Sequence, residues 1–181
     1  MGKKQTRTKV PDLSDSAIVE RALSLANDWM WAVSLQHDRI ARPRKRDVAF
    51  HPFGIALFNE ADVHFLTISL RRLRIVVSAL EHVPELQGAI RAALEAFDTR
   101  LPWVKSIRDV FEHLEDYAID SNRRKSDRCR RELQVWSATE NDVNWLGFDI
   151  DWREALLAAE NLHGSAMTAI RIFADKKSKE D

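Results

Sequence analysis

An arginine and a histidine stand five positions apart in the segment Ile-Arg-Asp-Val-Phe-Glu-His-Leu-Glu-Asp-Tyr, residues 107–117, and together they could cleave RNA without a metal. A histidine takes and gives a proton near neutral pH, so His113 could act as a general acid or base. An arginine can hold phosphate and stabilise its developing charge, and this role is open to Arg108. We therefore regard Arg108 and His113 as candidate catalytic residues.

The helical period decides which neighbouring side chains could assist the histidine. The segment is expected to lie within a helix over about 101–120. Asp109 precedes His113 by four residues and Tyr117 follows it by four, so all three share one face of that helix. Asp109 could orient the imidazole, and Tyr117 could bond a phosphate.

The same residues also fit a role without catalysis. Arg108 and His113 lie about 140° apart around one regular helix, and Glu112 offers Arg108 an ion pair at i+4. In that interpretation His113 only caps a packed face. The spacing also recurs at Arg46 and His51 in a proline-containing segment, so it does not identify a catalytic site by itself.

A strongly basic segment follows the motif helix. It could bind an RNA backbone, with each phosphate contact adding salt-dependent affinity, or it could be a solvated linker. Its cationic residues are Arg123, Arg124, Lys125, Arg128, Arg130 and Arg131. Three further arginines, Arg71, Arg72 and Arg74, are expected on the polar face of an earlier helix.

Composition restricts the class of protein. A chain of 181 residues with 45% hydrophobic and 31% charged residues is typical of one soluble globular domain. The formal net charge is zero, so any anion binding must come from local patches. The single cysteine, Cys129, excludes an internal disulfide and a cysteine-based zinc site, and it fits a reducing cytoplasm.

Several other classes lack their signatures in the sequence. No apolar run approaches the roughly 18 residues that a membrane helix needs. No glycine-rich phosphate loop, nucleophile elbow or pair of histidines at i+4 occurs either. We expect a cytoplasmic protein with no membrane association, no metal and no cofactor.

The elements that must position these residues are mainly helical. Apolar residues at spacings of three and four predict helices at about 14–37, 60–81, 84–98, 101–120 and 151–174. Pro84 suits the first turn of the third helix, and the segment 39–52 is expected to be a loop. The inward face of the first helix is expected to hold Ile18, Ala22, Leu25, Trp29 and Val33. That of the second is expected to hold Val63, Leu66, Leu70, Leu73, Val77 and Leu80.

A change of period predicts one β element. Alternation on both sides of Asn141-Asp142 predicts a hairpin of two short strands within about 132–150. The expected fold is mainly α, an up-and-down bundle of about five helices with a small β-hairpin inserted before the last helix. It forms a single domain over 14–174, with charged flexible tails at 1–13 and 175–181.

The motif Arg-Asp-x-x-x-His, on an amphipathic helix within a helical domain, resembles the Arg-x4–6-His signature of the HEPN superfamily (higher eukaryotes and prokaryotes nucleotide-binding). Asp109 stands where that signature usually has a polar residue. The following Glu-Asp-Tyr, basic linker, hairpin and final helix look like uncharacterised bacterial proteins grouped near this superfamily. The resemblance implies a helical bundle that dimerises and brings the two motif helices together at a cleft.

The resemblance also implies a function, a metal-independent RNase or an RNase-like toxin or defence protein. His113 would then be the acid–base group acting on a ribose 2′-OH, and Arg108 would bind the scissile phosphate while Asp109 assists by positioning. The implied products carry 2′,3′-cyclic phosphate ends. The implied partners are a second copy of the chain, RNA and a protein antitoxin. The alternative is a helical binding or scaffold protein with no enzymatic activity.

Overall fold

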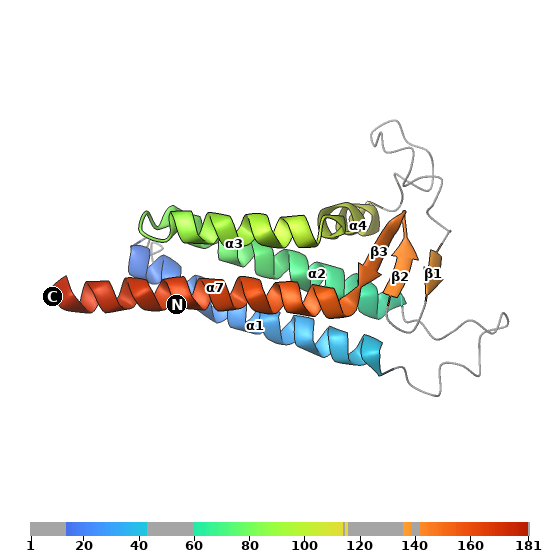
Figure 1. Ribbon diagram of the computed structural model, residues 1–181, viewed down its shortest axis with the longest axis horizontal. Coiled ribbons are helices and arrows are strands. Elements are labelled where there is room, and N and C mark those ends of the chain that lie inside the picture. Colours follow the sequence, from blue (N-terminus) through green and yellow to red (C-terminus); the bar gives the residue numbers. More distant parts are fainter. Residues whose placement is uncertain (1–13, 43–59, 114, 116–135, 139–141, 181) are drawn as a thin grey trace, which may run out of the picture.

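Four long helices run alternately up and down in the computed structural model, which describes residues 14–42, 60–113, 115, 136–138 and 142–180 (Figure 1). They are α1 (Asp15–Ala41), α2 (Glu60–Ser78), α3 (Gln87–Arg100) and α7 (Trp152–Glu180). The 3-10 turn η2 (Ala79–His82) continues α2. Helix α1 packs on α2 and α7, and α3 packs on α7 and α2. The predicted mainly α, up-and-down bundle is confirmed.

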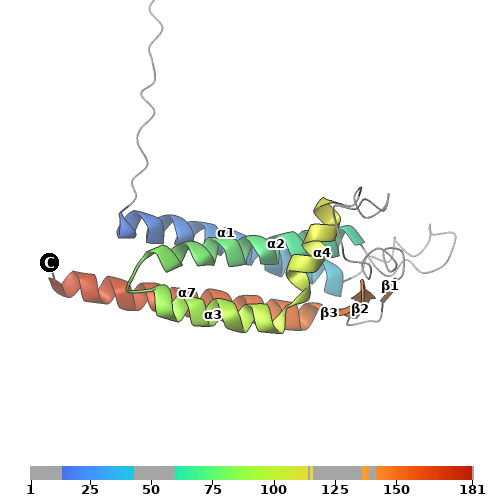
Figure 2. The ribbon, with the colours of Figure 1, turned by 90° about the horizontal axis from the view of Figure 1, so that it is seen from above.

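A fifth helix, α4 (Trp103–Glu112), crosses the end of this bundle and packs against α2 (Figure 2). It buries Trp103, Val104, Ile107 and Val110 in the common core. A helix of this length is not stable alone in water. The position of the candidate catalytic residues therefore depends on how this one face packs.

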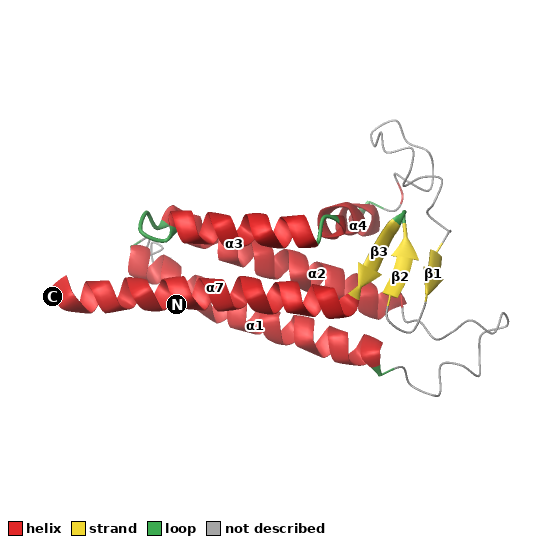
Figure 3. Ribbon diagram, in the orientation of Figure 1, coloured by secondary structure: helices red, strands yellow, loops and turns green. Residues whose placement is uncertain are grey.

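A small antiparallel sheet lies at the same end of the bundle (Figure 3). Its strands, in the order β1-β2-β3, are β1 (Trp136–Ala138), β2 (Asp142–Trp145) and β3 (Phe148–Asp151). The predicted hairpin corresponds to β1 and β2, which pair Trp136 with Trp145, whereas β3 is an additional strand. Leu146 and Gly147 form the turn before β3 with φ angles of 54° and 71°, as a two-residue hairpin loop requires.

The last helix starts directly from the sheet. The Asp151 carboxylate accepts hydrogen bonds from the backbone N–H groups of Arg153 (2.8 Å) and Glu154 (3.1 Å), so it caps the first turn of α7. Glu154 also pairs with Arg100 at the end of α3, with 2.6 Å between Oε1 and Nε. These contacts fix the sheet relative to α3 and α7.

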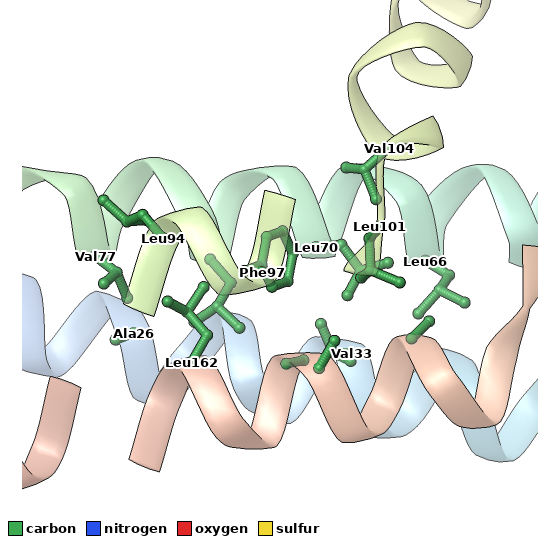
Figure 4. Close-up of a cluster of buried hydrophobic side chains, with 14 of the residues drawn as sticks. Ala26, Val33, Leu66, Leu70, Val77, Leu94, Phe97, Leu101, Val104 and Leu162 are labelled. Atoms are coloured by element: carbon green, nitrogen blue, oxygen red, sulfur yellow. The ribbon is translucent and has the colours of Figure 1, made fainter. Parts of the chain in front are cut away.

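The core lies along the shared axis of the four long helices (Figure 4). All six residues predicted on the inward face of the second helix are buried, five of them in α2 and Leu80 in η2. On α1 the prediction is correct for Ala22 and Val33 but wrong for Leu25, which is 46% exposed, while the adjacent Ala26 is buried. Small alanine side chains on that face allow α1 to approach its neighbours closely.

The end of the first helix and the start of the third differ from the prediction. Helix α1 continues through Ala41 into the predicted loop 39–52. There the Nε atom of Arg39 lies 2.9 Å from Oδ1 of the buried Asp62 at the start of α2. A buried carboxylate needs a cationic partner. The contact with Asp62 therefore favours a helical conformation that extends as far as Arg39. At the other end of α2, α3 begins at Gln87 rather than Pro84 because the N–H groups of Leu86 and Gln87 both bond to the Val83 carbonyl in a turn.

The C-terminal segment 175–181 was predicted as a flexible tail, but α7 continues through Glu180. Lys177 donates a hydrogen bond of 2.6 Å to the Ser16 hydroxyl at the start of α1, and its ammonium lies 5.9 Å from the Phe173 ring centroid. These contacts tie the extension to the bundle. The predicted tail 1–13 lies outside the described residues, and none of the described helices has the length and apolarity required to cross a bilayer.

Candidate functional site

The motif residues lie at the C-terminal end of α4, which ends at Glu112. The predicted helix extends to residue 120, but residues 114 and 116–120 lie outside the described residues. His113 leaves the helical conformation with φ −130° and ψ 35°. Its backbone N–H still donates to the carbonyls of Asp109 (3.2 Å) and Val110 (3.3 Å). Acidic side chains are unfavourable at the carbonyl end of a helix, and Glu112 is the last residue of α4, so α4 has no favourable charge at this end.

Asp109 and His113 form the first pair at this helix end. Oδ1 of Asp109 lies 4.0 Å from Nε2 of His113, which is an electrostatic contact rather than a hydrogen bond. The side chains are 29% and 36% exposed, respectively. The imidazole is therefore near a carboxylate, as the spacing predicts, and can be reached from solvent.

Arg108 forms the second pair, with Glu112 at i+4 on the other side of the helix. Both side chains are about one-third exposed. A partly exposed pair of this kind contributes about 0.3–0.5 kcal/mol to stability. An incoming phosphate could therefore displace the Glu112 carboxylate from the guanidinium at low cost.

Arg71 on α2 lies beside the candidate site, and the sequence did not single it out as a functional residue. Because α4 crosses α2, Arg71 lies within electrostatic range of Arg108 and Glu112. Burial, then the positive charges of Arg74 and Arg108, lower the pKa of Arg71 below its ordinary value. Within the described part of the chain no carboxylate lies within 4.0 Å of its guanidinium. The only sequence feature that pointed to Arg71 was the run of arginines in α2, and we interpreted that run as an exposed polar face.

An aromatic cluster holds the end of α4 beside the sheet. The ring centroids of His64 and Phe111 lie 4.0 Å apart, edge to face, and those of Phe111 and Trp145 lie 4.8 Å apart. The cluster joins α2, α4 and β2 just before His113. It restricts how far the motif residues can move relative to the bundle.

Other predicted site residues cannot be placed in this arrangement. Tyr117 and the basic residues of 123–131 lie outside the described residues. Arg108 pairs with Glu112 and His113 contacts Asp109, so among the described contacts each of the two motif residues has its own carboxylate as partner. Across the described ranges, no group of three or more His, Cys, Asp or Glu side chains could hold a metal ion.

Comparisons with protein-family models, with curated proteins and with solved structures gave no significant match.

Proposed function

We propose that this protein is a metal-independent endoribonuclease of the HEPN type, acting in the cytoplasm. His113 is the acid–base group, Arg108 binds the scissile phosphate, and Asp109 positions the imidazole. The observation that supports this most is the Asp109–His113 pair, which is open to solvent on the same short helix as a partly exposed arginine. An imidazole in such a place can meet a substrate without a change of fold.

The reaction uses groups of the protein and of RNA together with a proton from solvent. The 2′-OH gives its proton to His113, and its oxygen attacks the adjacent phosphorus while the bond from phosphorus to the 5′-oxygen breaks. The departing 5′-oxygen takes a proton from solvent, leaving a 2′,3′-cyclic phosphate and a 5′-hydroxyl. Arg108 stabilises the additional negative charge on the phosphoryl oxygens as the new bond forms.

Dimerisation completes the proposed site. Arg108 and His113 of one chain contact different carboxylates, and a single phosphodiester would be served by Arg108 of one copy and His113 of a second. The proposed partners are therefore a second copy of the chain and RNA. A protein antitoxin is a further proposed partner, as the resemblance implies.

One observation favours a second candidate function, a helical binding or scaffold protein without catalysis. Glu112 already neutralises the Arg108 guanidinium within the same helix, and His113 ends that helix through its backbone N–H. Both residues then have structural roles that need no substrate.

Substitution of His113 separates the two functions. We expect the wild-type protein to cleave RNA in the presence of EDTA, and His113→Ala to lower the rate by about 10²–10⁴-fold because the proton acceptor is lost. His82→Ala is the matched control, because His82 is an exposed histidine in η2, at the opposite end of α2 from α4. Equal inactivity of the folded wild type and His113→Ala on several classes of RNA would favour the binding or scaffold function.

A further inference from the structure

A cleft of about 430 Å³ opens where α2, α3 and the first turn of α4 meet. This volume is within the range of small-molecule sites, about 300–1,000 Å³. Its apolar part is formed by Phe97, Leu101 and Pro102, and its charged part by Arg71, Arg74, Asp98 and Lys105. Neither Arg108 nor His113 lines it, so it is distinct from the pairs at the end of α4.

Positive charge in and beside the cleft exceeds the negative charge available to balance it. Arg74 forms a bidentate pair with Asp98, with 2.7 Å between Nε and Oδ1 and 2.6 Å between a terminal guanidinium nitrogen and Oδ2. Glu112 is similarly engaged by Arg108 just outside the cleft. The two carboxylates that act on Arg71, Asp98 and Glu112, are thus already paired with other arginines.

Two cations of the cleft are left without such a partner. Arg71 is half-buried and Lys105 is exposed, and neither forms an ion pair within the described residues. Burial, Arg74 and Arg108 lower the pKa of Arg71, and this effect exceeds the opposing effect of the Asp98 and Glu112 carboxylates. An anion in the cleft would add the negative charge that Arg71 and Lys105 lack.

We infer that the cleft between α2, α3 and α4 binds a phosphate group, with Arg71 and Lys105 as its cationic ligands. Arginine binds phosphate through paired N–H donors, and lysine acts on it as a point charge. One or two negative charges on a phosphate match the two unpaired cations. The bidentate pair with Asp98 takes two of the five N–H donors of Arg74 and holds its guanidinium in place beside the cleft. The apolar wall is available to the group that carries the phosphate.

The test measures binding to the full-length protein with two probes. The first is a short fluorescein-labelled DNA oligonucleotide, which lacks the 2′-OH and so reports binding whether or not the protein cleaves RNA. The second is inorganic pyrophosphate, followed by calorimetry. We expect Arg71→Gln to weaken binding by about tenfold or more, the loss typical of a charge-assisted contact. The matched control, Arg72→Gln, removes an exposed cation that does not line the cleft.

Two further measurements distinguish a direct loss of phosphate binding from a loss caused by misfolding of the variant. Lys105→Gln changes an exposed side chain, and it is expected to weaken binding and to reduce the salt dependence of the affinity by about one phosphate contact. Arg71→Gln is expected to keep or raise the melting temperature, since it removes a crowded positive charge.

Selective loss in Arg71→Gln with the oligonucleotide supports the site and identifies a polynucleotide backbone as the source of the phosphate. Selective loss with pyrophosphate alone supports the site and identifies a free phosphate compound as the source. The inference is overturned if the wild type binds neither the oligonucleotide nor pyrophosphate. It is also overturned if Arg71→Gln and Arg72→Gln weaken binding equally.

Discussion

Replacing Arg108 by alanine is expected to lower kcat/KM for RNA by about 10²–10³-fold, the usual loss when a donor to a developing negative charge is removed. The structural effect is much smaller, because the ion pair with Glu112 is partly exposed and contributes about 0.3–0.5 kcal/mol. An effect on activity of that size therefore cannot arise from a loss of stability. Initial rates on a defined RNA in EDTA, together with urea unfolding of the same samples, measure the two effects separately.

The partner substitution supplies the control for Arg108. Glu112→Gln releases the guanidinium from its carboxylate while preserving the size of the side chain, so we expect it to retain or increase RNA cleavage. If the two residues have only a structural role, both substitutions remove the same ion pair and give the same small loss of stability with no difference in activity. That second result would contradict a role for Arg108 in phosphate binding.

Replacing Ile107 by alanine is expected to lower the free energy of unfolding by about 2–5 kcal/mol. Ile107 is fully buried on the face of α4 that packs into the common core. A loss of this size is a large part of the 5–15 kcal/mol that stabilises a typical domain. Because α4 is too short to be stable alone, the same substitution should also disturb the position of the motif residues.

Ile75→Ala is the matched control for that substitution. Ile75 is the same residue type on α2 but is 43% exposed, so its truncation should change the free energy of unfolding by about 0.5 kcal/mol or less. Urea unfolding, monitored by tryptophan fluorescence, measures the free energy of unfolding of both variants. The two values are comparable if the slope of this free energy against urea concentration is unchanged. Equal losses for Ile107→Ala and Ile75→Ala would show that α4 is not held by this packing.

Local periodicity was sufficient to predict much of the bundle. The six apolar residues of α2 recur at spacings of three and four, and they are buried because a helix with one such stripe must face the core. Helix α1 carries overlapping apolar stripes, and periodicity cannot decide between Leu25 and Ala26. That choice depends on how closely the neighbouring helices approach, which is a property of the whole bundle.

The third strand was missed because its turn has an unusual residue. Gly147 suits the positive φ of a two-residue hairpin loop, but leucine is rarely found in that conformation. Leu146 is fully buried, and the burial of its side chain offsets the unfavourable backbone. Such compensation comes from tertiary packing, so the local sequence pattern does not indicate it.

The candidate site was predictable only as far as it is local. The contacts of Asp109 with His113 and of Arg108 with Glu112 follow from the i,i+4 spacing alone. The place of Arg71 beside Arg108 depends on α4 crossing α2, a tertiary contact that no spacing within the chain specifies.

The proposed reaction is tested most directly by removing the attacking group from the substrate. The wild-type protein is incubated in EDTA with an RNA oligonucleotide and with the same oligonucleotide carrying 2′-deoxyribose at each cleavage position, and the product ends are determined by mass spectrometry. We expect cleavage of the RNA to a 2′,3′-cyclic phosphate and a 5′-hydroxyl, with the deoxy substrate left intact. Equal cleavage of both substrates, or no cleavage of either by the folded protein, would contradict the proposed function.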